Sequence, residues 1–145
     1  MEQTQTQQGN QQQAQAQQQS QLLRYALRGN GLFSASSGLI LVAAGPALSS
    51  FTGITPALAL QIVGAVLLLY GAGLLWISTR AEIDRRVAWT AIILDVAWVA
   101  GSIMILLAGW LPLTVAGKWT VAVLADVVAV FAIVQYVGLR RLPPG

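Results

Sequence analysis

The chain has 145 residues, of which 56% are apolar and only 9% are charged, with a net charge of +3. A soluble domain carries about 45–50% apolar and about 25% charged residues, and a chain this small could not bury the excess. Composition therefore excludes a soluble domain and indicates an integral membrane protein. Because histidine and cysteine are absent, disulfides, cysteine nucleophiles and most metal sites are excluded, and we expect no metal, no cofactor and no enzymatic activity.

Two segments precede the apolar part of the chain. Residues 1–21 contain 12 glutamines and almost nothing to bury, which predicts a disordered leader, either a tolerated extension or an assembly tail. Residues 22–30 combine leucines and a tyrosine with Arg24 and Arg28. This pattern favours an amphipathic helix lying in the membrane interface, as an anchor or as a docking surface for a partner.

The spacing of charges predicts the membrane spans. No charge occurs between Arg28 and Arg80, and one helix crosses the hydrocarbon core in about 20 residues, so this gap holds two spans and a turn. Turn signals lie between Gly45-Pro46 and Thr55-Pro56. After the charged segment that follows Arg80, two further apolar runs occur. We predict a four-helix transmembrane domain at residues 31–141, with spans at 31–50, 56–78, 87–110 and 118–138, and a tail at 142–145.

The predicted fold is all-α, a polytopic four-helix bundle made of two hairpins, compatible with a parallel pseudo-repeat. Membrane helices pack through small residues, because apolar side chains gain little over lipid tails. Each span carries such residues on one face. The predicted helix-packing residues are Ser34, Ser37, Gly38, Gly64, Gly71, Ala97, Gly101, Ala125 and Ala129.

The basic residues predict the orientation in the membrane. Seven arginines fall on one side of the predicted spans, and Lys118 alone falls on the other. The positive-inside rule therefore places both termini in the cytoplasm. The positive charge suits contact with anionic lipid headgroups, and no basic cluster indicates nucleic-acid binding.

Two aspartates, Asp95 and Asp126, remain inside the predicted spans at similar depths. A charged Asp at a helix centre costs at least about 2.5–3.5 kcal/mol, so a protonated carboxyl, or a pair sharing one proton, is the less costly state. The pair is compatible with hydrogen-bonding between helices or subunits, or with a proton or cation site. Gln135 lies on the face of its helix opposite Asp126, so we do not expect it in the same cluster.

Two further residues belong to the candidate polar site. Trp98 and Ser102 share a helix face with Asp95 and are candidate hydrogen-bond donors. Trp98 is also the one tryptophan predicted to lie deep in the membrane, whereas the other four suit an interfacial belt. Tyr70 is the nearest polar candidate from another span. No catalytic constellation accompanies these residues.

Four strings stand out within residues 22–142: LRGN at 27–30, FSASSG at 33–38, DVAWVAGS at 95–102 and QYVGLRR at 135–141. They resemble strings of small bacterial inner-membrane proteins with four predicted spans. The resemblance implies a bacterial inner-membrane location and no particular activity. The DoxX-like group is similar in size and span count only.

The leading functional hypothesis is a non-enzymatic membrane protein, a homo-oligomer or an accessory subunit of a larger complex. One alternative is a small proton-coupled carrier that uses Asp95 and Asp126. Another is a lipid or quinone site between the hairpins, lined by Trp98, Tyr70 and the serines of the first span.

Overall fold

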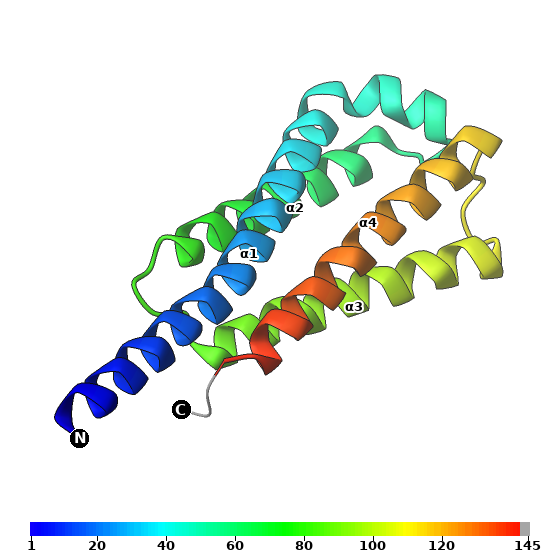
Figure 1. Cartoon of the computed structure of the whole chain (residues 1–145). Coiled ribbons are helices and arrows are strands. Elements are labelled where there is room, and N and C mark those ends of the chain that lie inside the picture. Colours follow the sequence, from blue (N-terminus) through cyan, green and yellow to red (C-terminus); the bar gives the residue numbers. More distant parts are fainter. Residues whose placement is uncertain (143–145) are drawn as a thin grey trace.

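The computed structural model describes residues 1–142, apart from the side chains of Ala16 and Gln19. It contains four helices, α1 (Glu2–Thr52), α2 (Ala57–Ser78), α3 (Arg85–Ala108) and α4 (Val115–Arg140) (Figure 1). Each is long and apolar enough to cross a membrane. The predicted all-α, four-helix membrane bundle is therefore confirmed. The predicted tail lies outside the described residues, except for its first residue.

The helices form two antiparallel hairpins that pack side by side (Figure 1). Helix α1 packs against both α2 and α4, and α4 packs against α3, whereas α2 and α3 make no extensive contact. The bundle is therefore held together mainly through α1 and α4. This arrangement leaves the space between α2 and α3 less tightly closed than the rest.

The N-terminal segment differs from the prediction. Instead of a disordered leader and a separate interfacial helix, α1 runs continuously from Glu2 into the first span. Glutamine has a good intrinsic helix propensity, and the helix that follows supplies a nucleus from which the segment extends. Its described side chains up to Gln18 are exposed. Propensity, rather than burial, accounts for its conformation.

Helix α1 bends at Ala44, whose backbone leaves helical geometry (φ −111°, ψ 16°), two residues before Pro46. Gly45-Pro46 is therefore a kink and not the predicted turn signal. Proline lacks the N–H that would bond the carbonyl of Val42 four residues earlier. The Gln61 side-chain amide of α2 donates to that carbonyl instead, at 3.2 Å. Gly45 leaves room for it, since a Cβ there would lie 2.7 Å from the Gln61 Cγ.

Small residues bring α1 and α2 into backbone contact, as predicted for three of them. A Cβ on Gly38 would lie 2.5 Å from the Gly64 carbonyl oxygen, and Gly71 lies similarly close to the backbone of α1. The α3 prediction is wrong within this bundle, because Ala97 is exposed and a Cβ on Gly101 would meet nothing within 4 Å. Of the remaining predicted packing residues, Ser34 and Ala125 are buried, and Ser37 and Ala129 are partly buried.

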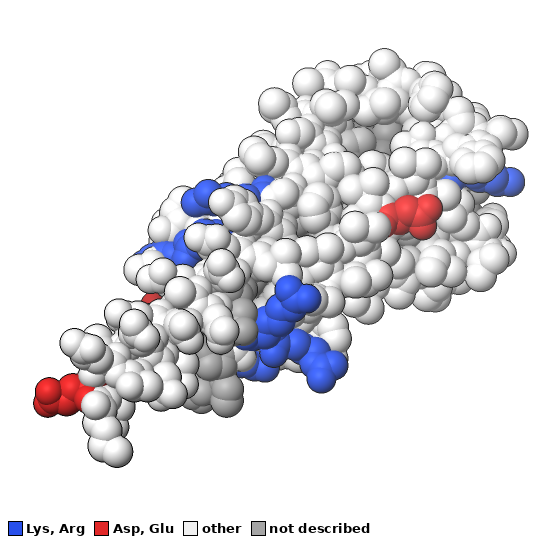
Figure 2. Space-filling model, viewed as in Figure 1, with Lys and Arg blue, Asp and Glu red and all other residues white. Residues whose placement is uncertain are grey.

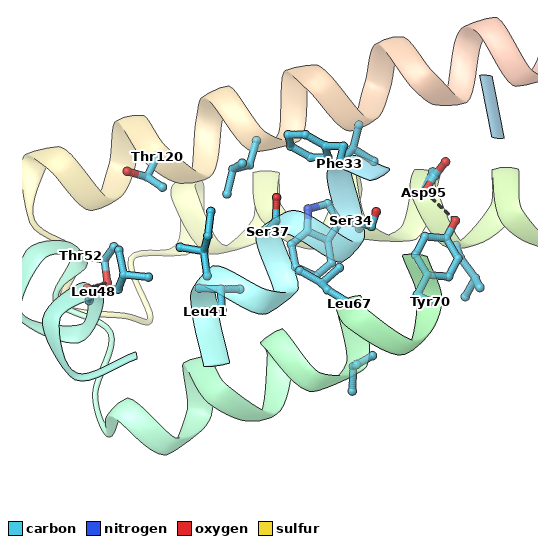
Figure 3. A pocket seen from close by; sticks show the side chains of 16 residues that line it. Phe33, Ser34, Ser37, Leu41, Leu48, Thr52, Leu67, Tyr70, Asp95 and Thr120 are labelled. Carbon is cyan, nitrogen blue, oxygen red and sulfur yellow. Dashed lines mark hydrogen bonds between the residues drawn. The ribbon is translucent and has the colours of Figure 1, made fainter. Parts of the chain in front are cut away.

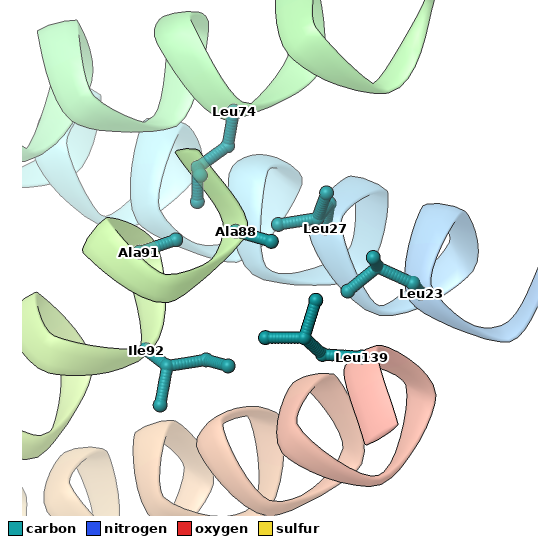
Figure 4. Close-up of a cluster of buried hydrophobic side chains, with 7 residues drawn as sticks. All are labelled: Leu23, Leu27, Leu74, Ala88, Ala91, Ile92 and Leu139. Atoms are coloured by element: carbon teal, nitrogen blue, oxygen red, sulfur yellow. The ribbon is translucent and has the colours of Figure 1, made fainter. Parts of the chain in front are cut away.

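The main apolar cluster lies at the end of the bundle where α1 enters and α4 ends (Figure 4). Leu23 and Leu27 of α1 are almost completely buried there, so residues 22–30 belong to the core and are not a separate interfacial helix. Arg24 turns to the α2–α3 loop, where its guanidinium donates to the carbonyl oxygens of Ser78, Arg80 and Ala81. All four helices contribute to the cluster, whose members are Leu23, Leu27, Leu74, Ala88, Ala91, Ile92 and Leu139.

The opposite end is joined by backbone contacts between α1 and α4. The Thr52 carbonyl accepts from the Thr114 N–H at 3.0 Å, and the Thr114 hydroxyl donates to the Phe51 carbonyl at 2.6 Å. The same hydroxyl oxygen caps α4 by accepting from the Gly117 N–H. A Cβ on Gly117 would overlap the Thr52 backbone. Close approach, and not side-chain packing, closes this end of the bundle.

Candidate functional site

Asp95 lies near the middle of α3 and is only 2% exposed. Three side chains from the other three helices donate hydrogen bonds to its carboxylate. Asn30 of α1 donates to Oδ2 at 2.6 Å, Gln135 of α4 donates to Oδ2 at 3.1 Å, and Tyr70 of α2 donates to Oδ1 at 2.8 Å. We call these four residues the Asp95 cluster. It joins all four helices at one level of the membrane domain.

The α1 side of the cluster begins with a polar stripe. Asn30 is completely buried, and its Oδ1 accepts from the Ser34 hydroxyl at 3.2 Å. Ser34 lies one turn further along α1, and Ser37 almost one turn beyond that. With Oδ1 occupied by Ser34, the Asn30 amide presents its N–H to Asp95. The spacing of this stripe was visible in the sequence, but its connection to Asp95 was not.

Tyr70 reaches the cluster across the weakly packed α2–α3 boundary. Its hydroxyl lies 2.8 Å from Asp95 Oδ1 and 3.2 Å from the Ala91 carbonyl oxygen. A phenol has one proton to donate, and the shorter contact is the one to the carboxylate. The Ala91 carbonyl is a second acceptor within reach. Tyr70, expected only as the nearest polar candidate from another span, therefore bonds directly to Asp95.

Gln135 was excluded from the polar cluster in the prediction, and that exclusion is wrong. The residue is completely buried, and its amide N–H donates to Asp95. Its Oε1 atom has no hydrogen-bond partner among the described residues. A buried unpaired acceptor costs about 1–3 kcal/mol. The amide therefore keeps its orientation toward the carboxylate and leaves its own oxygen unpaired within this part of the chain.

Asp126 does not join Asp95. It lies near the middle of α4 on the exposed face, nine residues from Gln135. At 3.6 residues per turn this is two and a half turns, so the two side chains lie on opposite faces of the helix. The predicted opposition of Gln135 and Asp126 is therefore correct, but the residue that faces Asp95 is Gln135. A shared proton between the two aspartates is excluded by this geometry.

A cavity of about 370 Å³ extends from the Asp95 cluster toward the opposite end of the bundle (Figure 3). Asp95 and Tyr70 lie at one end of it, and Leu48, Thr52 and Thr120 lie at the other. All four helices line it, mostly with apolar side chains. The lining residues are Phe33, Ser34, Ser37, Ile40, Leu41, Leu48, Thr52, Val66, Leu67, Tyr70, Leu94, Asp95, Trp98, Thr120, Leu124 and Val128.

The cavity is open to the side of the bundle. Val66 of α2 and Leu94 of α3 both line it and are also exposed, by 61% and 49%. These residues lie on the two helices that have no extensive contact with each other. In a bilayer, this opening faces the hydrocarbon chains of the lipids and not water.

The two predicted donors beside Asp95 have different roles. Trp98 lines the cavity, and its indole N–H makes no hydrogen bond within residues 1–142. Ser102 is buried, but its hydroxyl donates to the Trp98 carbonyl of its own helix at 2.8 Å. Neither residue bonds to Asp95. The hydrogen-bonded cluster therefore keeps Asp95 of the predicted site, gains Asn30, Tyr70 and Gln135, and does not include Asp126, Trp98 or Ser102.

Charge is distributed unevenly over the outside of the bundle. Figure 2 shows basic side chains gathered toward one end, a separate basic group at the other end, and a broad uncharged surface between them. Lys118 is the basic residue at the start of α4, while Arg140 lies in its last turn. One acidic group interrupts the uncharged surface over α4, the helix whose only acidic residue is Asp126.

No protein-family model matches the chain, and neither the curated proteins nor the solved structures give a match. The resemblance to small bacterial inner-membrane proteins therefore stays a prediction.

Proposed function

We propose that the protein is a membrane protein without enzymatic activity that binds a lipophilic molecule, of the lipid or quinone type, inside its helix bundle. The observation that carries the proposal is the cavity, which is lined mostly by apolar side chains and has the Asp95 cluster at one end. Ligand sites in proteins are concave, mostly apolar spaces of about 300–1,000 Å³ with a few placed polar groups. The cavity has this size and this character.

The side opening supports a ligand that arrives from the membrane. A molecule dissolved in the bilayer can pass Val66 and Leu94 without entering water. Its polar group would then meet Asp95 and Tyr70, while its apolar part would fill the space toward Leu48 and Thr120. This role needs no reacting group, which suits a chain without histidine or cysteine.

A cavity-filling variant with a matched control tests the proposal. Leu67 lines the cavity, whereas Leu69, two residues along the same helix, is 74% exposed. Native mass spectrometry of the full chain, purified in mild detergent from its own membranes, should show a retained lipophilic molecule. Leu67→Trp should remove that molecule and Leu69→Trp should keep it. The proposal fails if the unaltered protein carries no such molecule, or if both variants retain it equally.

A second candidate function rests on Asp126. This exposed acid lies near the middle of α4, where a charge facing lipid costs at least about 2.5–3.5 kcal/mol. A contact with a second copy or with another membrane subunit would remove that cost. The exposed Ala97 and the open surface at Gly101 on neighbouring α3 would allow a helix backbone to approach closely. These features support a homo-oligomer or an accessory subunit of a membrane complex.

Replacement of Asp126 by leucine distinguishes a carboxyl that faces lipid from one that faces a partner, because the expected effects on the protein are opposite. If the carboxyl faces lipid alone, Asp126→Leu should raise the stability of the bundle, because an apolar side chain suits the bilayer. If it faces a partner, the same change should dissociate the complex on sizing in mild detergent. Val123→Leu, at another exposed position of α4, is the control. A monomer of raised stability would refute the subunit hypothesis.

We also propose that the protein lies in a bacterial inner membrane with both termini in the cytoplasm. The support is the placement of seven arginines in the first half of α1, around the α2–α3 loop and at the end of α4, opposite Lys118. Because the chain has no cysteine, single cysteines can report the orientation. A membrane-impermeant maleimide should label Val115→Cys but not Ala81→Cys in intact spheroplasts. The reverse labelling would overturn the orientation.

A proton-coupled carrier that uses Asp95 and Asp126 together has no support in this geometry. Asp95 is buried among donors from three helices, and Asp126 lies on the outer face of α4. The two carboxyls share no hydrogen-bonded path within the described residues. We therefore do not propose this mechanism.

A further inference from the structure

The polar groups that line the cavity differ between its two ends. At the far end, the Thr52 hydroxyl donates to the Leu48 carbonyl and the Thr120 hydroxyl donates to the Ala116 carbonyl. Both hydroxyl protons are therefore used within their own helices. Ser37, about midway along the cavity, and Trp98, one turn from Asp95 on α3, line it with a hydroxyl and an indole that have no hydrogen-bond partner in the described part of the chain. Unused hydrogen-bonding capacity therefore lies between the middle of the cavity and Asp95.

The Asp95 carboxylate itself has one acceptor position left. The three donated hydrogen bonds favour the ionised form of Asp95 over the protonated form expected from the sequence. An ionised carboxylate offers about four lone-pair positions on its two oxygens. Asn30 and Gln135 occupy two of them on Oδ2, and Tyr70 occupies one on Oδ1. The remaining position belongs to Oδ1, the oxygen that accepts from Tyr70. Both Tyr70 and Asp95 line the cavity. A donor group inside the cavity could fill it.

No positive charge balances Asp95. Among the residues that line the cavity there is no lysine or arginine, and Asp95 is the only acid. Its three partners are a tyrosine and two neutral amides. Two like charges in a medium of low dielectric constant repel strongly. An anionic head group would therefore meet a carboxylate without a neutralising cation.

Resting on the proposed function, we infer that the cavity selects a long apolar molecule whose head group is uncharged or cationic and donates a hydrogen bond to Asp95 Oδ1. Long-chain alcohols, amines and quinol-like heads belong to this class. Ionised fatty acids and other anionic amphiphiles do not. The head lies beside Tyr70, and the chain extends past Ser37 toward Leu48 or out through the side opening.

Three probes of equal chain length test this selectivity: dodecanol, dodecylamine and dodecanoate, each brominated at the fourth carbon, close to the head group and to Trp98. Bromine quenches tryptophan fluorescence on contact, and Trp98 lines the cavity. The four other tryptophans are at least 39% exposed and are replaced by phenylalanine, so that Trp98 is the only fluorophore of its kind. The full chain is placed in nanodiscs of zwitterionic lipid at alkaline pH, where the fatty acid is ionised.

We expect the brominated dodecanol and dodecylamine to quench Trp98 saturably at concentrations about tenfold to hundredfold lower than dodecanoate does. A difference of this size corresponds to one charge-assisted hydrogen bond. Asp95→Asn should bring the three probes to within a few fold of one another. Glu82→Gln makes the same chemical change in an exposed loop and should leave the preference intact.

The outcomes separate the two proposals. If dodecanoate binds as tightly as dodecanol, the selectivity inferred from Asp95 is wrong, while the cavity remains a binding site. If no probe gives saturable quenching of Trp98, the proposed function itself fails. The comparison of probes on the unaltered binding site needs no variant of Asp95, so it stands even if Asp95→Asn does not fold.

Discussion

The contact between α1 and α2 makes a quantitative prediction at Gly38. A Cβ at this position would lie 2.5 Å from both the Gly64 carbonyl oxygen and the Leu68 nitrogen, where ordinary contact is 3.4–4 Å. These are backbone atoms, so Gly38→Ala must push the two helices apart, and even a gap of about 0.5–1 Å forfeits a quarter to a half of each dispersion contact along the interface.

The expected cost follows from two opposing effects. Overpacking of a close interface destabilises by about 1–3 kcal/mol, whereas alanine improves helix propensity by up to about 1 kcal/mol. We expect a net loss for Gly38→Ala. Gly73 of α2 is the matched control, because a Cβ there would meet nothing within 4 Å. Gly73→Ala should therefore be neutral or stabilising.

The free energy of unfolding of the two variants, measured by titration with a denaturing detergent in mixed micelles, decides the question. The predicted result is a loss of stability for Gly38→Ala and none for Gly73→Ala. A Gly38→Ala variant as stable as Gly73→Ala would contradict the close approach of α1 and α2, and with it the wall of the cavity that α1 and α2 form together.

Two further predictions concern hydrogen bonds to backbone carbonyls. Gln61→Leu should destabilise the bundle by about 0.5–1.5 kcal/mol, because the Val42 carbonyl loses its donor. In a Pro46→Ala background this loss should vanish, since alanine at position 46 supplies the missing N–H. A double-mutant cycle that shows no coupling between the two substitutions would contradict this explanation. Arg24→Met should keep the apolar stem but remove the donors to the Ser78 and neighbouring carbonyls. We expect a loss of about 1.5–3 kcal/mol and faster amide exchange in the α2–α3 loop; unchanged exchange there would count against the contact.

The membrane bundle could be predicted because charge is costly in lipid. The long interval without charge between Arg28 and Arg80 can hold only two spans, and α1 and α2 occupy it. The contact through Gly38, Gly64 and Gly71 could be predicted for a similar reason, since small residues repeat along one face. Composition could not predict whether Ala97 and Gly101 of α3 face another helix of the bundle. The same spacing of small residues suits a contact inside the bundle and a contact on its outer surface.

The polar site could be predicted only in part. The depth of Asp95 followed from counting residues along α3, but its partners depend on how each helix is rotated about its own axis. Gln135 and Asp126 lie on opposite faces of α4, so only one of them can face α3. A mostly apolar helix carries little information about which face that is. The unexpected partner Asn30 is a related case, because it lies in a segment that was assigned to the interface.

The cavity and the kink in α1 are connected. Before Ala44, the small residues of α1 hold it against α2; after the kink, its last turns run toward the start of α4 (Figure 1). Leu48 and Thr52 then lie at the far end of the cavity, and the Thr52 carbonyl bonds to Thr114. The bend therefore closes the end of a space that straight helices would leave open.

A space of this size is not neutral for the stability of the bundle. The atoms that line an unfilled space of about 370 Å³ lack partners for dispersion contacts, and this loss destabilises the bundle. The side opening at Val66 and Leu94 lets a chain from the membrane fill it, and an ordinary lipid tail would meet that need without any polar end wall. A lipid tail would leave two other sources of instability in place. They are the Gln135 oxygen, which has no partner among the described residues, and the buried carboxylate of Asp95. A head group that bonds to Asp95 would offset the second of these, and for that reason the polar end of the cavity favours a ligand with a head group over a plain lipid tail.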